Sequence, residues 1–271
     1  MTEPTHRVAP ETSSGPLKIP ADQELLFREV LQLFELWKIP YAVAGAFAMQ
    51  QHTGIFRDTK DLDLFLTAES ATVALGLLQR AGFDCEICDP VWLFKAKRGE
   101  YFVDLITGMS NATIVVDDSW IRRARPAIVY DVRTCVLAAE ELLASKLFVT
   151  RRERFDGADI AHIIYGTRGE LDWARILQLA GDNWEMLLWA LVLFRYVYPG
   201  QTSFVPLDLW RDLLQRFENL VSQPDPTAEF RGSLIDEKMF AIDLNEWGLN
   251  NLMQLYRERR MRSLSTICKN Q

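Results

Sequence analysis

The spacing of apolar residues divides the chain into two parts. From Asp22 to Trp37 they return every three or four positions, which predicts an amphipathic helix that ends before Pro40. Beyond Pro40, short apolar runs bounded by turn residues predict strands, with a short helix from Ala46 and a longer one over 70–81 between them. The predicted strands cover 41–45, 61–66, 83–88, 91–97 and 101–107, and the run Lys97-Arg98-Gly99-Glu100 is typical of a hairpin turn between the last two.

From about residue 137 the pattern changes to helices. The predicted helices cover 139–153, 159–165, 172–180, 184–196, 207–220 and 245–261. We therefore expect an α/β (α+β) fold, in which a mixed sheet with helices precedes a mainly α-helical C-terminal region. Four prolines and no hydrophobic periodicity predict a flexible tail over 1–21. The expected boundaries place a core at 22–133 and the helical region at 134–271.

The composition is that of an ordinary globular protein, with 49% hydrophobic and 25% charged residues among 271. A formal net charge of -7 argues against a protein that coats nucleic acid, so RNA is a permitted but not a favoured partner. The longest apolar run, 186–194, is too short to span a bilayer, and we expect no membrane partner. The polar N-terminus has no apolar signal region, which predicts a cytoplasmic address.

Three acids carry the candidate chemistry. Asp61 and Asp63 alternate with leucines in one predicted strand, so both carboxylates point to the same face. Asp104 stands in a second predicted strand, between Val103 and Leu105. Acids in hydrophobic strands carry a desolvation cost, which a divalent cation such as Mg²⁺ or Mn²⁺ compensates. Taken singly, the Asp-x-Asp pair is a weak signal, because acids that alternate with hydrophobic residues also mark a half-exposed strand.

These acids belong to a wider pattern that resembles the signature of the nucleotidyltransferase-fold superfamily, the group related to DNA polymerase beta and to small antibiotic nucleotidyltransferases. The spacing looks most like bacterial stand-alone nucleotidyltransferases related to abortive-infection and toxin–antitoxin nucleotidyltransferases. The matching segments, within about 22–166, are Gly45-Ala46, Arg57-x-Thr59-x-Asp61-Leu-Asp63-Leu, Val103-Asp104-Leu105, Glu141-x-x-x-x-Lys146 and Arg154-x-Asp156-x-x-Asp159. Relatives usually carry Gly-Gly or Gly-Ser at the first of these, and Ala46 lacks the serine hydroxyl.

The resemblance implies an ATP- or other NTP-binding enzyme that moves an NMP group onto a hydroxyl of an unknown acceptor, which is a small molecule, a protein or an RNA end. The core over 22–133 would then be catalytic. In such a reaction two metals about 3.5–4 Å apart can clamp the attacking and leaving oxygens. The implied metal ligands are Asp61, Asp63 and Asp104, the implied triphosphate-neutralising residue is Lys146, and the implied nucleotide contacts are Gly45, Ala46, Arg57, Thr59 and Asp159.

Several alternatives stay open at this stage. Lys146 is also typical of a surface lysine paired with Glu141 or Glu153, and Asp156 of an N-cap for the following helix. The alternative function is a non-catalytic nucleotide-binding or protein-interaction module of the same fold, for which Ala46 is the one hint. A partner protein or a homodimer is compatible with either function.

Overall fold

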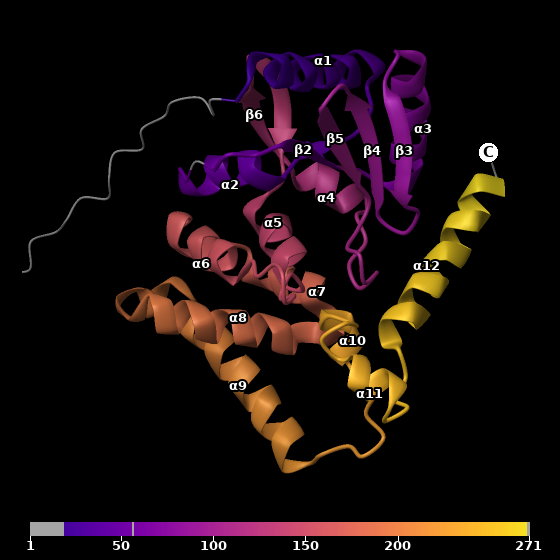
Figure 1. Ribbon diagram of the computed structural model, residues 1–271. Coiled ribbons are helices and arrows are strands. Elements are labelled where there is room, and N and C mark those ends of the chain that lie inside the picture. The colour runs from indigo at the N-terminus through magenta and orange to yellow at the C-terminus, as the bar shows by residue number, and fades with distance from the viewer. Residues whose placement is uncertain (1–18, 56, 270–271) are drawn as a thin grey trace, which may run out of the picture.

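The computed structural model describes residues 19–55 and 57–269, so the predicted tail lies almost wholly outside the described residues. The strands of the described chain form one mixed seven-stranded sheet (Figure 1). They are β1 (Ala42–Val43), β2 (Asp61–Phe65), β3 (Asp84–Asp89), β4 (Leu93–Arg98), β5 (Tyr101–Ile106), β6 (Arg125–Val129) and β7 (Val132–Val136), in the order β3-β4-β5-β2-β1-β7-β6. The fold class predicted from the apolar pattern is confirmed.

Two long helices cover the sheet. The helix α1 (Ala21–Trp37) packs against β5 and β7, and α3 (Ala68–Arg80) packs against β3 and β4. The predicted periodicity of α1 corresponds to its buried face, on which Phe27, Val30 and Phe34 are fully buried. The shorter helices of this part are α2 (Gly45–Thr53), which begins directly after β1, and α4 (Asp118–Arg123).

The C-terminal part is helical, as expected; in Figure 1 most of it lies below the sheet, and its last helix rises at the right to the level of the sheet. Its helices are α5 (Ala139–Lys146), α6 (Gly157–Gly166), α7 (Trp173–Ala180), α8 (Trp184–Val197), α9 (Leu207–Ser222), α10 (Gly232–Ile235), α11 (Ala241–Asn245) and α12 (Leu252–Lys269), with 3-10 turns at Gly181–Asn183 and Pro199–Phe204. The helix α5 links the two parts, because it packs against α2 as well as against α6 and α7. Within the described residues, no helix combines the length and the hydropathy needed to cross a membrane.

Two helix predictions were wrong at their ends. The helix predicted over 139–153 stops at Lys146, because the backbone N–H of Asp156 donates to the carbonyl of Val149 at 2.8 Å and the chain turns back. The helix predicted over 245–261 is broken between α11 and α12, where Gly248 takes a φ of +69°. The segment 118–136, which the apolar pattern left unassigned, contains α4, β6 and β7.

Candidate active site

Asp61, Asp63 and Asp104 converge in the middle of the sheet. The parallel pairing of β2 with β5 sets Asp63 directly beside Asp104 and Asp61 beside Phe102. One carboxylate oxygen from each acid lies within 4.8 Å of the other two. Carboxylate oxygens are the ligands that Mg²⁺ and Mn²⁺ prefer, so the donor set fits a small divalent cation.

The loop before β2 fixes the first of these carboxylates. The hydroxyl of Thr59 donates to Asp61 Oδ1 at 2.8 Å. The carbonyl of Thr59 in turn accepts a hydrogen bond of 3.0 Å from the amide of Gln23, a buried residue of α1. Thr59, predicted as a nucleotide contact, therefore touches the acidic cluster in this structure.

Gly45 lies directly against Asp63. Its φ is +55°, and a Cβ at this position would come within 2.0 Å of Asp63 Oδ2. Any other residue would therefore strain the backbone and collide with the carboxylate. Gly45 also opens α2, and its N-cap residue Ala44 makes no side-chain capping hydrogen bond. The helix thus presents uncapped N–H groups beside the acids.

Two of the three acids, Asp63 and Asp104, have raised pKa values. Burial raises the pKa of Asp63 to about 7, and the negative charges of Asp61 and Asp104 act in the same direction, while Lys146 and Arg154 oppose them. Burial also raises the pKa of Asp104, against the opposing effect of Lys95. This cluster is short of positive charge, which is the condition that a bound cation relieves.

Lys95 is the counter-ion of the third acid. It lies opposite Asp104 in the antiparallel pairing of β4 with β5. Its Nζ is 2.5 Å from Asp104 Oδ1, although the contact lacks hydrogen-bond geometry and leaves that buried oxygen without a hydrogen-bond partner among the described residues. The third acid is therefore compensated in charge but not in hydrogen bonding.

A second charge cluster comes from α5, α6 and the loop between them. Lys146 Nζ donates to Asp156 Oδ2 at 2.9 Å and to Asp159 Oδ2 at 2.7 Å, and all three side chains are buried. Arg154 donates from Nε and Nη2 to both oxygens of Asp156, at 2.9 and 3.0 Å. Burial alone would raise the pKa of Asp156, but Arg154 and Lys146 together hold it below its ordinary value.

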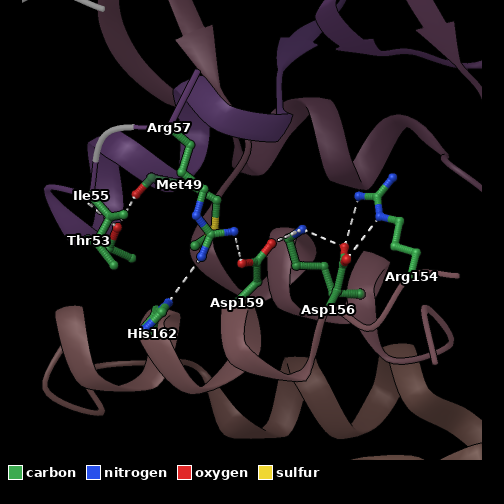
Figure 2. Close-up of polar contacts among 9 residues, drawn as sticks. Met49, Thr53, Ile55, Arg57, Arg154, Asp156, Asp159 and His162 are labelled. Carbon is green, nitrogen blue, oxygen red and sulfur yellow. Dashed lines mark hydrogen bonds and ion pairs between the residues drawn. The ribbon is translucent and has the colours of Figure 1, made fainter. Parts of the chain in front are cut away.

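Arg57 joins this cluster from the loop before β2. Figure 2 shows its guanidinium pointing at Asp159, to which it donates a hydrogen bond, and at His162, whose Nδ1 is 3.3 Å away. Burial and the charge of Arg57 lower the pKa of His162. The predicted nucleotide contacts Arg57 and Asp159 thus bind each other across 102 residues of sequence.

All nine site residues predicted from the sequence line one cavity of about 460 Å³. The acids lie on its sheet wall, and Lys146 with its partners forms the helical wall. Apolar side chains, including Met49, Trp92 and Phe148, complete the lining. The nine residues are Gly45, Ala46, Arg57, Thr59, Asp61, Asp63, Asp104, Lys146 and Asp159.

The contacts also decide two of the open alternatives. Lys146 is buried rather than on the surface, and in the described structure its ion pairs are with Asp156 and Asp159, not with Glu141 or Glu153. Asp156 does occupy the N-cap position of α6, but its side chain makes no capping hydrogen bond. The role of Asp156 at this place is to pair with Lys146 and Arg154.

Sequence reasoning missed two contributors. Lys95 was accessible to it, because the hairpin turn at 97–100 fixes the register that sets Lys95 opposite Asp104. Arg257 of α12 was not, since its partners are remote in sequence: it donates to both oxygens of Asp89 at 3.0 Å and to the carbonyl of Ser110 at 2.7 Å. Asp89 also accepts a hydrogen bond from Trp92 Nε1 at 3.0 Å. Because Trp92 and Ser110 line the cavity, these contacts connect α12 to its edge.

No family model and no curated protein matches the chain. Among solved structures, it is similar to the antibiotic-resistance factor ANT(2'')-Ia, with 14% identity, 67% of this chain and 96% of that chain covered, and a TM-score of 0.42. It is also similar to the lincosamide antibiotic adenylyltransferase LnuA in its lincomycin-bound form, with 18% identity, coverages of 54% and 98%, and a TM-score of 0.38. A third likeness is to an antigenic nucleotidyltransferase-like protein from Paracoccidioides brasiliensis, with 20% identity, coverages of 70% and 94%, and a TM-score of 0.43.

At these identities and TM-scores, the likenesses say nothing about the chemistry of this chain. The chemistry of the site therefore has to come from the residues of this chain.

Proposed function

We propose that this chain is a metal-dependent nucleotidyltransferase that moves an NMP group from an NTP to a hydroxyl of an acceptor. One observation carries the proposal: three carboxylates from two neighbouring parallel strands converge within 4.8 Å in a cavity whose opposite wall carries buried positive charge. A divalent cation suits the first wall and a triphosphate suits the second. We further propose that the reaction takes place in the cytoplasm, where NTPs are plentiful.

Mg²⁺ or Mn²⁺ would be held by Asp61 and Asp63, with Asp104 beside them. The fit rests on the hard oxygen donors and on the positive charge that the cluster lacks, shown by the raised pKa of Asp63. When bound, such an ion supplies Lewis-acid stabilisation of the charge that develops on phosphoryl oxygens. Gly45 keeps the space against Asp63 Oδ2 open, so the carboxylate stays in place.

Positive groups on the helical wall would receive the triphosphate. An ammonium has three N–H donors, and the two hydrogen bonds of Lys146 to Asp156 and Asp159 leave one for a phosphate oxygen. Arg154 lines the same cavity and binds Asp156 through Nε and Nη2 only. The uncapped start of α2 at Gly45 adds backbone N–H groups, which favour anions.

Asp104 would take the proton of the attacking hydroxyl. The acceptor oxygen forms a bond to the α-phosphorus, the bond from that phosphorus to the bridging oxygen breaks, and pyrophosphate leaves with the electron pair. A base works best when its pKa lies near the working pH, and burial raises the pKa of Asp104 in that direction. The acceptor supplies the proton, so atoms and charges balance.

The test uses α-labelled and γ-labelled ATP, GTP, CTP and UTP, each with Mg²⁺ or Mn²⁺ and a cell extract. We expect the α label, and not the γ label, to appear on an acceptor, whose class is then shown by protease, nuclease and size fractionation. Transfer of the γ label would mean phosphoryl transfer instead. The control is the double variant Asp61→Asn/Asp63→Asn, which should transfer neither label.

The alternative function predicts a different result. A non-catalytic module would bind an NTP in the same cavity without transferring either label, with any of the four nucleotides and with either metal. Equal transfer by the wild type and the double variant would contradict the placement of the chemistry at the acidic cluster.

A further inference from the structure

Lys95 touches the acidic cluster but does not line the cavity. The side chain comes from β4 and reaches Asp104 on β5 from the next strand of the sheet, because the two residues are cross-strand partners. Its Nζ is 2.5 Å from Asp104 Oδ1, and the side chains are only 17% and 12% exposed. Little water reaches such a buried ion pair, so water cannot take the place of either partner.

Lys95 is held from a second side by an aromatic ring. Its Nζ lies 3.6 Å from the centroid of Phe102, which precedes Asp104 by two positions and therefore shares its face of β5. The ammonium is thus fixed between the ring and the carboxylate. A bound cation that needed the same oxygen of Asp104 would have to break both contacts.

The charges of the sheet wall also favour a single bound cation. The carboxylates of Asp61, Asp63 and Asp104 bring three negative charges, and the ion pair with Lys95 offsets one of them. Two negative charges remain, which is the amount that a single divalent cation balances. Without Lys95, one more negative charge of the cluster would be uncompensated, which would favour the binding of a second cation.

We propose that Lys95 takes the place of the second metal ion, so that the site binds one divalent cation per chain, held by Asp61 and Asp63. The proposal rests on the proposed function insofar as it takes the acidic cluster to be a cation site. Asp104 then remains beside the acceptor hydroxyl with a fixed ammonium as its partner, rather than as a ligand of a second ion. Lys95 is a positioning residue, since it acts through Asp104.

The number of bound ions tests this directly. Mn²⁺ is titrated by electron paramagnetic resonance into the wild type, with and without the α,β-methylene analogues of the four NTPs, which cannot transfer an NMP group. We expect one Mn²⁺ per chain. The Mn²⁺ that the analogue binds on its own is measured in protein-free controls and subtracted. Lys95→Met, which removes the charge but keeps a long side chain, should bind two Mn²⁺, with the second showing spin coupling to the first.

Two further variants serve as controls. Lys95→Arg keeps the positive charge and should bind one Mn²⁺. Lys97→Met alters the same strand two positions away, at a lysine that pairs with Glu86 rather than with the acidic cluster, and should also bind one. Unfolding midpoints of all variants confirm that they are folded.

Two ions per chain in the wild type would overturn the inference, even if Lys95→Met failed to fold. A folded Lys95→Met protein with one Mn²⁺ and wild-type affinity would overturn it as well. Both results would leave the proposed function standing. If the wild type bound no Mn²⁺ with or without any analogue, the proposed function would fail too, and the two failures are thus distinguishable.

Discussion

Two clusters of aspartates line opposite walls of the cavity, and they differ in how their charge is balanced. On the sheet wall, burial and the like charges of Asp61 and Asp104 raise the pKa of Asp63 to about 7. On the helical wall, Asp156 accepts hydrogen bonds from Lys146 and Arg154, and its pKa falls below the ordinary value. Burial raises the pKa of both residues, so the partners decide the difference.

The two walls differ in whether their charges are balanced before a ligand binds. The carboxylates of the helical wall are paired with the lysine and the arginine beside them, so this wall is held together before a triphosphate binds. In the described structure, the carboxylates of the sheet wall are not all paired in this way, and their repulsion is tolerated in the fold because strand pairing fixes the three acids in place. Stability given up at one such cluster is typical of a site that a ligand completes.

The sharpest test of this difference is the same substitution on each wall. Asp63→Asn should reduce NMP transfer by roughly 10³-fold or more, because it weakens a metal site that contributes several kcal/mol. It should also stabilise the metal-free protein by removing repulsion. Asp156→Asn should instead destabilise the protein, by about 1–3 kcal/mol, because it disrupts the two hydrogen bonds that Arg154 donates to the Asp156 carboxylate. Transfer assays and urea unfolding in EDTA measure both, and a loss of stability in both variants would contradict the comparison.

Lys146→Met should have the next largest effect. It removes the ammonium between Asp156 and Asp159, whose side chains are 8% and 9% exposed. Removing one partner of a buried ion pair typically costs about 3–5 kcal/mol, and urea unfolding should show a loss of this order. Arg154 keeps part of the charge balance, so a loss near the lower end is expected. If Lys146→Met unfolds at the wild-type urea concentration, the helical wall is not held together by these ion pairs.

The pH dependence of stability should show the raised pKa of Asp63. Its native pKa is about 7 against an ordinary 3.8, so between these values the native state binds more protons than the unfolded state. The free energy of unfolding in EDTA should therefore fall as the pH rises from 4 to 7. The fall is at most about 4 kcal/mol, and less because Asp63 faces an open cavity. The difference between wild type and Asp63→Asn isolates this contribution, and a flat difference curve would exclude it.

Gly45→Ala should lower stability less than Lys146→Met and about as much as Asp156→Asn. The positive φ and the 2.0 Å approach of a Cβ to Asp63 Oδ2 predict a loss of about 1–3 kcal/mol, together with weaker cation binding. Gly76→Ala is the matched control, because a Cβ there meets no atom within 4 Å and the residue lies within α3. Calorimetric Mn²⁺ titration and urea unfolding measure the two effects. A Gly45→Ala protein with wild-type Mn²⁺ affinity would show that Asp63 does not need its present position.

Much of the sheet wall could be predicted from the sequence, because its signals are local. Alternation along one strand puts Asp61 and Asp63 on one face, and an acid between Val103 and Leu105 marks the neighbouring strand. The resemblance brought Asp104 to the other two acids, but the parallel pairing of the two strands was not predicted. Lys95 was predictable in principle, from the hairpin register alone.

The helical wall was harder to predict, because its contacts are tertiary. The helix predicted through Glu153 in fact ends at Lys146, and only the turn at 149–156 brings Arg154 and Asp156 to the lysine. The rim contact of Arg257 with Asp89 spans 168 residues and has no local signal. Pairings of this kind depend on how the helices pack, which apolar periodicity does not specify.

The unfolding midpoint with and without ligands tests the central comparison most directly. If the sheet wall is completed by a divalent cation with an NTP, both together at 100 times the dissociation constant stabilise the native state by about 2.7 kcal/mol. For a chain of this length that corresponds to a rise of roughly 5–10 °C. We expect the rise to require Mg²⁺ and one of the four NTPs together, and to vanish in Asp61→Asn/Asp63→Asn. An equal rise in that double variant, or no rise with any NTP, would contradict the assignment of this wall as the ligand site.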